Sequence, residues 1–288
     1  MTVVGARMKI EKRSIKVNNI KVSFYETGQG NPGLPLILLH GGGVDSANLS
    51  YGSILPIIGE TYHVIAPDLP GYGETDKPDV PYTMEWYQDF LKDLIQVLDY
   101  KQVNLGGLSL GGGITLGYTL NHPKQVRHLI LIAPYGLTDE IPFIRLSVWL
   151  LNHQRIYDFF NKLMVSNNIF LKWSLKRILV NPDAMTHEVL TEVKDASHNP
   201  DVGRAWRAFQ LSEIDNRKLR TYYVDQLPDL NLPVLLLTGK NDALVPSKDL
   251  KRASTLIPHS QLVEIEQCGH WLPRDRGPEF IQALQNFL

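Results

Sequence analysis

The sequence of 288 residues lacks several patterns that would assign it to a class at once. Cys268 is the single cysteine, so no disulfide can form within the chain and nothing indicates an oxidising compartment. No stretch approaches the roughly 18 uninterrupted apolar residues that a membrane-spanning helix needs. Residues 1–7 lack the apolar core of a signal peptide. We therefore expect a cytoplasmic protein without a membrane partner.

Basic runs and metal-binding patterns are also scarce. Lys and Arg number 29 against 30 Asp and Glu, which gives a formal net charge of −1, and no basic cluster resembles a nucleic-acid footprint. No group of His, Cys and acidic residues has metal-ligand spacing, and no glycine pattern matches a dinucleotide or phosphate-binding loop. The sequence thus predicts no metal, no cofactor and no nucleic-acid partner. We expect a monomer or a homodimer.

The most informative stretch of the sequence runs from Val103 to Gly113. It begins with apolar residues, passes through glycines around Ser109, and continues in a helical pattern from Ile114. Residues 107–111 read G-L-S-L-G and match G-x-S-x-G, in which a nucleophilic serine sits on a tight turn between a strand and a helix. Glycines suit this turn because it is strained and neighbouring backbone passes close to it. The context predicts that Ser109 is a nucleophile.

The rest of the chain predicts a helix-covered sheet. Alternation of apolar and polar residues over 9–27, interrupted by Asn18-Asn19, indicates an antiparallel hairpin with a two-residue turn. Mainly apolar runs typical of buried parallel strands occupy 36–39, 63–66, 128–133 and 234–237, and the strand-helix order predicts a further strand at 261–265. Helical patterns such as 84–100 lie between them, so we expect right-handed crossovers in a parallel sheet.

Between residues 136 and 228 the pattern changes from strands to helices. We predict helices at about 141–152, 155–165, 168–180, 186–197 and 201–213, and no strand. Aromatic residues are frequent in this segment. We expect most of them to be packed in the core and a minority to line an apolar pocket. A helical insertion between two strands of a sheet indicates a cap over the carboxyl edge of that sheet.

Two residues that a nucleophilic serine requires follow the last two predicted strands. Asp242 comes after 234–237 and His270 after 261–265, so the order is nucleophile, acid, histidine. All three lie beyond the carboxyl ends of strands, where open parallel sheets bind ligands. We assign His270 as the base that takes the proton of the serine. Asp242 would accept from the other ring nitrogen and fix the tautomer.

The sequence contains other candidates for the acid, the base and the nucleophile. Asp215, Asp225 and Asp229 lie in or beside the helical segment rather than after a strand, which favours Asp242. His40 is expected to brace a loop rather than to react. Cys268 is expected to be a packed small residue, because no second base accompanies it.

The acyl oxyanion formed during catalysis requires backbone N–H donors. We expect one donor from Leu110, directly after the nucleophile, and further donors from Gly42 and Gly43 of the sequence H-G-G-G at 40–43. Trp271, next to His270, is the candidate for a contact with substrate.

Together these motifs resemble the α/β-hydrolase fold superfamily. The resemblance covers nearly the whole chain: H-G-G-G at 40–43, D-x-x-G-x-G at 68–73, the serine turn, G-x-x-D-x-x-V-P at 239–246, and G-H at 269–270. It implies an α/β fold whose mostly parallel eight-stranded sheet is flanked by helices and carries an inserted helical cap. We place the core at 1–135 and 229–288 and the cap at 136–228.

Within the superfamily the chain resembles capped serine esterases, and in particular hydrolases of meta-cleavage ring-fission products. Two departures weaken the second resemblance. Leu108 stands where those enzymes usually carry Asn, and the segment 186–194, where they use a cap arginine, contains none. The haloalkane dehalogenases and epoxide hydrolases place Asp at the position of Ser109. Proline iminopeptidases carry Pro-Gly where this chain has Val44-Asp45.

Three functions remain open at this stage. Hydrolysis of a small to medium carboxylic ester through an acyl-serine intermediate is the simplest, with the small-molecule ester as the partner. The alternatives are C–C bond hydrolysis of a meta-cleavage-type diketo acid and a ligand receptor that turns over slowly. The fold alone does not choose between them.

Overall fold

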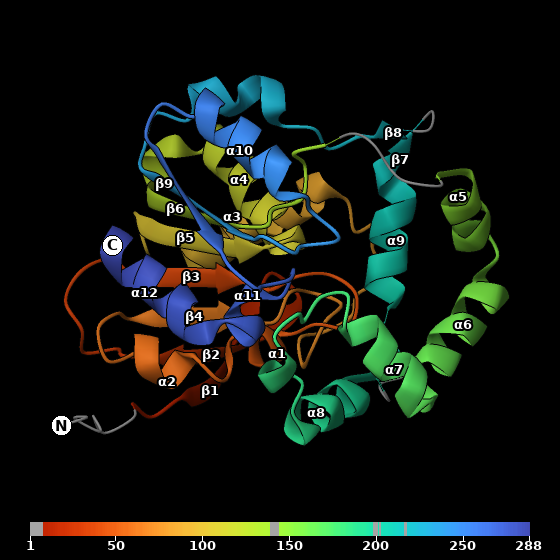
Figure 1. The fold of residues 1–288 in the computed structure, drawn as a ribbon. Helices are drawn as coiled ribbons and strands as arrows, with labels where there is room; N and C mark the ends of the chain where they lie inside the picture. The colour runs from red at the N-terminus through yellow and green to blue at the C-terminus, as the bar shows by residue number, and fades with distance from the viewer. Residues whose placement is uncertain (1–7, 139–143, 198–200, 202, 216–217) are drawn as a thin grey trace.

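The computed structural model describes the chain except for residues 1–7, 139–143, 198–200, 202 and 216–217. One eight-stranded sheet forms its centre, with the order β1-β2-β4-β3-β5-β6-β9-β10 (Figure 1). The strands are β1 (Glu11–Val17), β2 (Ile20–Thr27), β3 (Leu36–Leu39), β4 (Val64–Pro67), β5 (Val103–Leu108), β6 (Val126–Ile132), β9 (Val234–Gly239) and β10 (Ser260–Ile265). From β4 to β10 all neighbours are parallel, whereas β2 is antiparallel to β1 and to β4. The predicted mostly parallel eight-stranded sheet is confirmed.

The N-terminal hairpin turns at Asn18-Asn19, as the alternation predicts. Val17 pairs with Ile20, so the loop has two residues, and Asn18 has φ 52°. Asparagine tolerates this left-handed conformation better than most residues, because its short side chain can bond to the local backbone.

Helices cover both faces of the sheet, and this explains why its central strands are continuous apolar runs. Along β3, Ile37 and Leu39 belong to the core on one face, while Leu36 and Leu38 belong to the core on the other. The first core is closed by α3 (Met84–Val97), α4 (Leu110–Asn121) and α10 (Ser247–Leu256). The second is closed by α1 (Ala47–Tyr51), α2 (Leu55–Ile58), α11 (Leu272–Asp275) and α12 (Gly277–Phe287). Each fully buried leucine or isoleucine contributes about 1.5–3 kcal/mol relative to an exposed one.

Among the described residues, five helices lie between β6 and β9, in the segment predicted to form the cap. They are α5 (Ile144–Asn152), α6 (Gln154–Ser166), α7 (Asn168–Leu175), α8 (His187–Ser197) and α9 (Arg204–Glu213). They agree with the predicted helices, although the predicted start at 141–143 lies outside the described residues. The division at residues 136 and 228 stays a prediction. Short 3-10 turns occupy η1 (Pro123–Gln125), η2 (Pro182–Ala184) and η3 (Val224–Asp229).

Two features of the cap differ from the prediction. Helix α7 ends at Leu175 rather than near 180, because the backbone N–H groups of Val180 and Asn181 donate to Asp275 of the core instead of continuing the helix. A two-stranded ribbon of β7 (Ile214–Asp215) and β8 (Lys218–Leu219) follows α9. With two residues in each strand, it is too short to leave an alternating pattern.

The expectation that most cap aromatics are packed in the core is contradicted for four of the described residues, while Phe143 and the side chain of Phe160 lie outside the description. Phe209 is fully buried, but Trp149, Phe159, Phe170 and Trp173 are exposed. Apolar residues are not confined to protein interiors, so composition alone did not place them. Among the described residues, no helix combines the length and apolar character required to cross a lipid bilayer.

Candidate active site

Ser109 occupies the turn between β5 and α4 in a conformation that few residues adopt. Its φ is 51° and its ψ is −112°, a strained combination that costs on the order of 1–3 kcal/mol. The surrounding backbone holds it: Ser109 N–H donates to the Ile132 carbonyl at 2.9 Å, and Tyr135 N–H donates to the Ser109 carbonyl at 2.9 Å. The side chain of Ser109 does not cap α4, which leaves Oγ available for chemistry.

The glycines of the turn are required by close packing. A Cβ on Gly107 would lie 2.3 Å from the carbonyl carbon of Gly111, and a Cβ on Gly111 would lie 2.5 Å from the His40 carbonyl oxygen. Backbone atoms cannot give way cheaply at such distances. Any side chain at these positions would therefore displace Ser109.

His270 and Asp242 are in direct contact. His270 Nδ1 lies 2.7 Å from Asp242 Oδ2, and the Asp242 side chain is fully buried. The other oxygen of Asp242 accepts from the backbone N–H groups of Leu244 and Val245 at 2.7 and 2.9 Å. An ionised carboxylate only accepts hydrogen bonds, so His270 carries its proton on Nδ1 and presents Nε2 as a base.

Ser109, Asp242 and His270 follow the carboxyl ends of the parallel strands β5, β9 and β10, so they lie at the same edge of the sheet. Within the described part of the chain, no hydrogen bond joins Ser109 to His270. Catalytic hydrogen bonds are often long in unliganded enzymes and tighten only with substrate. The candidate nucleophile and the His270–Asp242 pair thus lie at the same edge of the sheet, and their catalytic roles stay predictions.

The loop after β3 lies against the nucleophile. A Cβ on Gly41 would be 3.6 Å from Ser109 Cβ. Gly41 N–H is already engaged, because it donates to Asp45 Oδ2 at 2.8 Å. The N–H groups of the three predicted donors, Gly42, Gly43 and Leu110, form no hydrogen bonds with the described residues. They are the groups available to an oxyanion.

Asp45 is a residue whose place in the site the sequence analysis missed. Its carboxylate accepts from Gly41 N–H, from Ser46 N–H at 2.7 Å and from Ser50 Oγ at 2.8 Å. Trp271 Nε1 in turn donates to Ser50 Oγ at 2.9 Å. The histidine loop is thereby joined to the loop that carries Gly42 and Gly43.

The donor count shows which form of Asp45 fits this network. Trp271 donates to Ser50, and the Ser50 hydroxyl then has its proton free to donate to Asp45. A protonated Asp45 would have to donate to Ser50 instead, so the hydroxyl proton of Ser50 would lose its acceptor. Burial raises the pKa of the Asp45 carboxyl, although the hydrogen bonds from Ser50, Ser46 and Gly41 partly offset this rise. The hydrogen-bond pattern favours the ionised form.

The structure gives Trp271 a packing and hydrogen-bonding environment. Its ring is buried, its indole N–H goes to Ser50, and its backbone N–H donates to the Ile178 carbonyl of the cap at 3.1 Å. The predicted contact of Trp271 with substrate stays a prediction.

His40 braces the loop, as expected from its position. Leu69 N–H donates to His40 Nε2 at 2.9 Å, so this nitrogen is unprotonated. The proton therefore lies on Nδ1, which donates to the Gly41 carbonyl at 2.8 Å. Burial of the ring lowers the pKa of His40. A neutral His40 thus ties the loop after β3 to the loop after β4.

Besides the Trp271–Ile178 hydrogen bond, the predicted cap contacts these loops through Trp206 and through the segment bound by Asp275. Trp206 of α9 lies over Gly42, where a Cβ would come within 2.4 Å of the indole ring. Asp275, which is buried, accepts from Gly269 N–H at 2.6 Å and from Val180 N–H and Asn181 N–H at 2.9 Å each. One carboxylate therefore binds both the segment before His270 and the cap.

A buried carboxylate lies where the cap rejoins the core. Glu213 at the end of α9 accepts from Thr221 N–H at 3.2 Å and interacts with the Tyr135 hydroxyl. Burial raises the pKa of Glu213. Tyr135 also touches the nucleophile through its backbone, which connects this carboxylate to the turn at Ser109.

The rival aspartates and histidines have other surroundings where the structure describes them. Asp225 and Asp229 are exposed, and the side chain of Asp215 lies outside the described residues. His63 bonds to Glu26 and His128 to Asn104. In the described ranges, no three His, Cys, Asp or Glu side chains are arranged to hold a metal ion.

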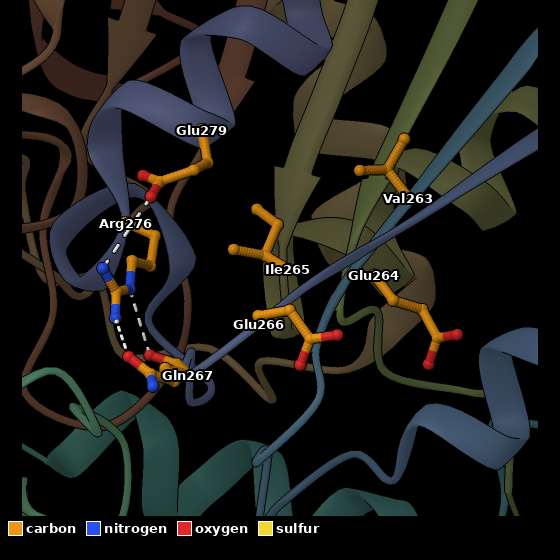
Figure 2. A pocket seen from close by; sticks show the side chains of 7 residues that line it. All are labelled: Val263, Glu264, Ile265, Glu266, Gln267, Arg276 and Glu279. Atoms are coloured by element: carbon orange, nitrogen blue, oxygen red, sulfur yellow. Dashed lines mark hydrogen bonds and ion pairs between the residues drawn. The ribbon is translucent and has the colours of Figure 1, made fainter.

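A cavity of about 380 Å³ lies beside the edge strand β10, away from Ser109 (Figure 2). Its polar side chains are largely paired with one another. Arg276 bonds to Gln267 and lies 3.8 Å from Glu279, Glu266 pairs with Lys240, and Glu264 pairs with Lys251. We assign no chemistry to this cavity.

Comparison with known proteins agrees with the fold. A family model described as the alpha/beta hydrolase fold matches residues 35–275. The chain is 27% identical to the 2-hydroxy-6-oxo-6-(2'-aminophenyl)hexa-2,4-dienoic acid hydrolase of Metapseudomonas resinovorans, over 96% of this chain and 90% of that protein. It is 27% identical to the 2-hydroxy-6-oxo-2,4-heptadienoate hydrolase of Pseudomonas putida, over 100% and 99%. A solved serine hydrolase involved in carbazole degradation superposes with a TM-score of 0.80 at 23% identity, covering 97% of this chain and 98% of the other.

Proposed function

The chain belongs to the alpha/beta hydrolase fold family, and from this we propose that it is a serine hydrolase that cleaves a small to medium carboxylic ester. The observation that carries the proposal is the site itself. A strained serine turn at Ser109 faces unengaged N–H groups, and a His270–Asp242 pair with a 2.7 Å contact follows neighbouring strands at the same edge. This combination suits acyl transfer to a hydroxyl nucleophile.

Each proton and bond has an assigned place in the proposed reaction. Ser109 Oγ attacks the ester carbonyl carbon while its proton moves to His270 Nε2, and Asp242 stabilises the resulting imidazolium. The carbonyl oxygen becomes an oxyanion held by the N–H groups of Gly42, Gly43 and Leu110. The C–O bond to the alcohol then breaks, and the alcohol leaves with the proton from His270. Water attacks the acyl-Ser109 in the same way and releases the acid.

The names of the relatives favour a second candidate, hydrolysis of the C–C bond of a meta-cleavage-type diketo acid. Two features of the chain, Leu108 and the segment 186–194, argue for the ester instead. Leu108, directly before the nucleophile, is buried, and its Cδ2 lies 3.8 Å from where a Cβ on Gly41 would be. An apolar side chain there offers no hydrogen bond to an enol substrate. The segment 186–194 supplies no arginine for a substrate carboxylate.

The test measures turnover of p-nitrophenyl esters from acetate to decanoate and of a synthetic meta-cleavage product by the same preparations. We expect rapid ester hydrolysis with an optimum chain length, and a loss of about 10⁴-fold or more in Ser109→Ala. Ser254→Ala, which removes a hydroxyl from α10 of the core, is the matched control and should retain wild-type rates. Ester hydrolysis that survives in Ser109→Ala would remove the nucleophile assignment. Faster cleavage of the diketo acid than of every ester would select the second candidate.

A further inference from the structure

The cap carries an exposed apolar face that the proposed reaction does not use. We define the cap face by six residues that are between 42% and 77% exposed. They are Leu146 and Trp149 of α5, Phe159 of α6, and Ile169, Phe170 and Trp173 of α7. Soluble proteins seldom gather large apolar side chains on their surface unless the surface binds something.

These side chains point away from the rest of the molecule. Successive residues of a helix are about 100° apart around its axis. Trp149 is two residues from the buried Leu151, and Ile169 and Trp173 are each two residues from the buried Leu171. They therefore lie about 200° from the side that packs against the protein.

Helix α6 follows the same rule. Ile156 and Tyr157 are partly buried, whereas Arg155, Asp158 and Phe159 are exposed, so the side of α6 that carries Ile156 and Tyr157 faces the protein. Phe159 comes two residues later and lies on the opposite side. In Figure 1, α9 stands between the sheet and the helices α5 and α6, which form the outer end of the molecule. The cap face is thus an outward surface.

Charge is concentrated in the same segment. Residues 144–177 contain six Lys or Arg and one Asp, a net charge of +5, so the remainder of the chain carries −6. Among the described side chains, Arg155, Lys172, Lys176 and Arg177 are exposed. Arg177 lies 5.6 Å from the ring centre of Trp173. Aromatic and basic residues are therefore interleaved on one side of an otherwise acidic protein.

We propose that the cap face binds the surface of a membrane that contains anionic phospholipids. Aromatic and aliphatic side chains insert at the level of the headgroups, and the surrounding Lys and Arg residues meet the negative surface potential. A second copy of the chain is a poorer occupant, because two faces of net charge +5 would repel each other. This proposal departs from the expectation of no membrane partner, which was based on the lack of a membrane-spanning segment and a signal peptide.

The test is flotation of the full chain with phosphatidylcholine vesicles, with and without about 30% phosphatidylglycerol. Wild type and Ser109→Ala are compared, so that binding is measured independently of hydrolysis. We expect both to float with the anionic vesicles only. Binding should fall at least tenfold in about 1 M salt, where the screening length is about 3 Å.

Two variants and a matched control locate the contact. Lys172→Glu/Lys176→Glu and Trp173→Ser should each weaken flotation at least tenfold while hydrolysis of a soluble ester is unchanged. The control, Lys92→Glu/Val97→Ser, makes the same kinds of change at exposed positions of α3 in the core and should float like wild type.

Three outcomes would overturn the proposal. The first is no binding to anionic vesicles, and the second is equal binding to neutral ones. The third is a dimer in sedimentation that Trp173→Ser dissociates, which would assign the cap face to a second copy of the chain. Circular dichroism and Tm verify that every variant is folded.

Discussion

Replacing Asp45 by Asn tests whether the network beneath the oxyanion loop contributes to catalysis. The carboxylate offers one oxygen to Gly41 N–H and the other to Ser46 N–H. Asparagine has a single carbonyl oxygen, so one of these N–H groups would face an amide NH₂ instead of an acceptor. A buried donor left without a partner costs about 1–3 kcal/mol. The loop relieves this cost by moving, and Gly42 and Gly43 move with Gly41.

The size of the effect follows from the role of the loop. Loss of one oxyanion donor lowers kcat by about 10²–10³. Displacement weakens the donors of Gly42 and Gly43 without removing them, so we expect kcat to fall about tenfold in Asp45→Asn and about a hundredfold in Asp45→Ala. KM should change by less than about twofold, because the oxyanion forms only after the ground-state complex.

The assay is steady-state hydrolysis of p-nitrophenyl butyrate with Tm measured on the same samples. Thr83→Ala is the control for stability alone: Thr83 caps α3 by accepting from Trp86 N–H at 3.1 Å, and its loss costs about 1 kcal/mol. That variant should melt earlier and keep wild-type kcat. Wild-type kcat in both folded Asp45 variants would refute the idea that this carboxylate positions the loop.

Three further predictions concern contacts around the site. Gly42→Ala should lower kcat/KM at least about tenfold, because the added Cβ would meet the ring of Trp206. Adding Trp206→Ala should restore much of the activity. A double variant no more active than Gly42→Ala would contradict this contact. Glu213→Gln should raise Tm at pH 8, by about 2–4 °C for each kcal/mol gained. Burial raises the pKa of Glu213 in the folded state, so its charge destabilises the wild type above that pKa, and the gain should vanish as the pH falls below 4.5; a gain that is independent of pH would exclude this cause. Burial lowers the pKa of His40, so wild-type Tm should fall as the pH drops below about 6.5; His40→Asn should melt earlier at pH 8 and lose less between pH 6.5 and 5, as scanning calorimetry would record.

Much of the fold could be predicted from the sequence, because strands of a parallel sheet that are buried on both faces consist of consecutive apolar residues. The segments 36–39, 64–67 and 234–239 are each buried at every position, since helices cover both faces of the sheet. The hairpin at Asn18 could also be predicted, because two alternating segments separated by two turn residues are typical of a β-hairpin. The short β7–β8 ribbon could not be predicted, because strands of two residues are too short to show a pattern in the sequence.

The candidate site could be predicted only in part. The position of Ser109, Asp242 and His270 at one edge could be predicted, because each follows a strand of the parallel sheet, and their catalytic roles stay predictions. Asp45 and Asp275 were not found, because they act through hydrogen bonds between loops that are far apart in the sequence; Trp271 and Ser50 are separated by 221 positions. Such pairs have no periodicity, and only the folded chain brings them together. Trp149 and Trp173 were expected in the core but are exposed. Hydrophobicity does not by itself decide whether a side chain packs inside the protein or lies on its surface.

The carboxylate of Asp275 has a consequence for engineering the cap. Exchanging caps between relatives assumes that the inserted helices can be replaced without breaking contacts that the core requires. Here the boundary between cap and core includes the loop of His270. The carboxylate of Asp275 accepts from Val180 and Asn181 on one side and from Gly269, the residue before His270, on the other. A chimaera whose segment at 178–181 follows a different backbone path would leave the buried Asp275 carboxylate short of two N–H donors and free the histidine loop. A transplanted cap would have to bring its own partners for Asp275, or the recipient would lose catalysis along with its former specificity.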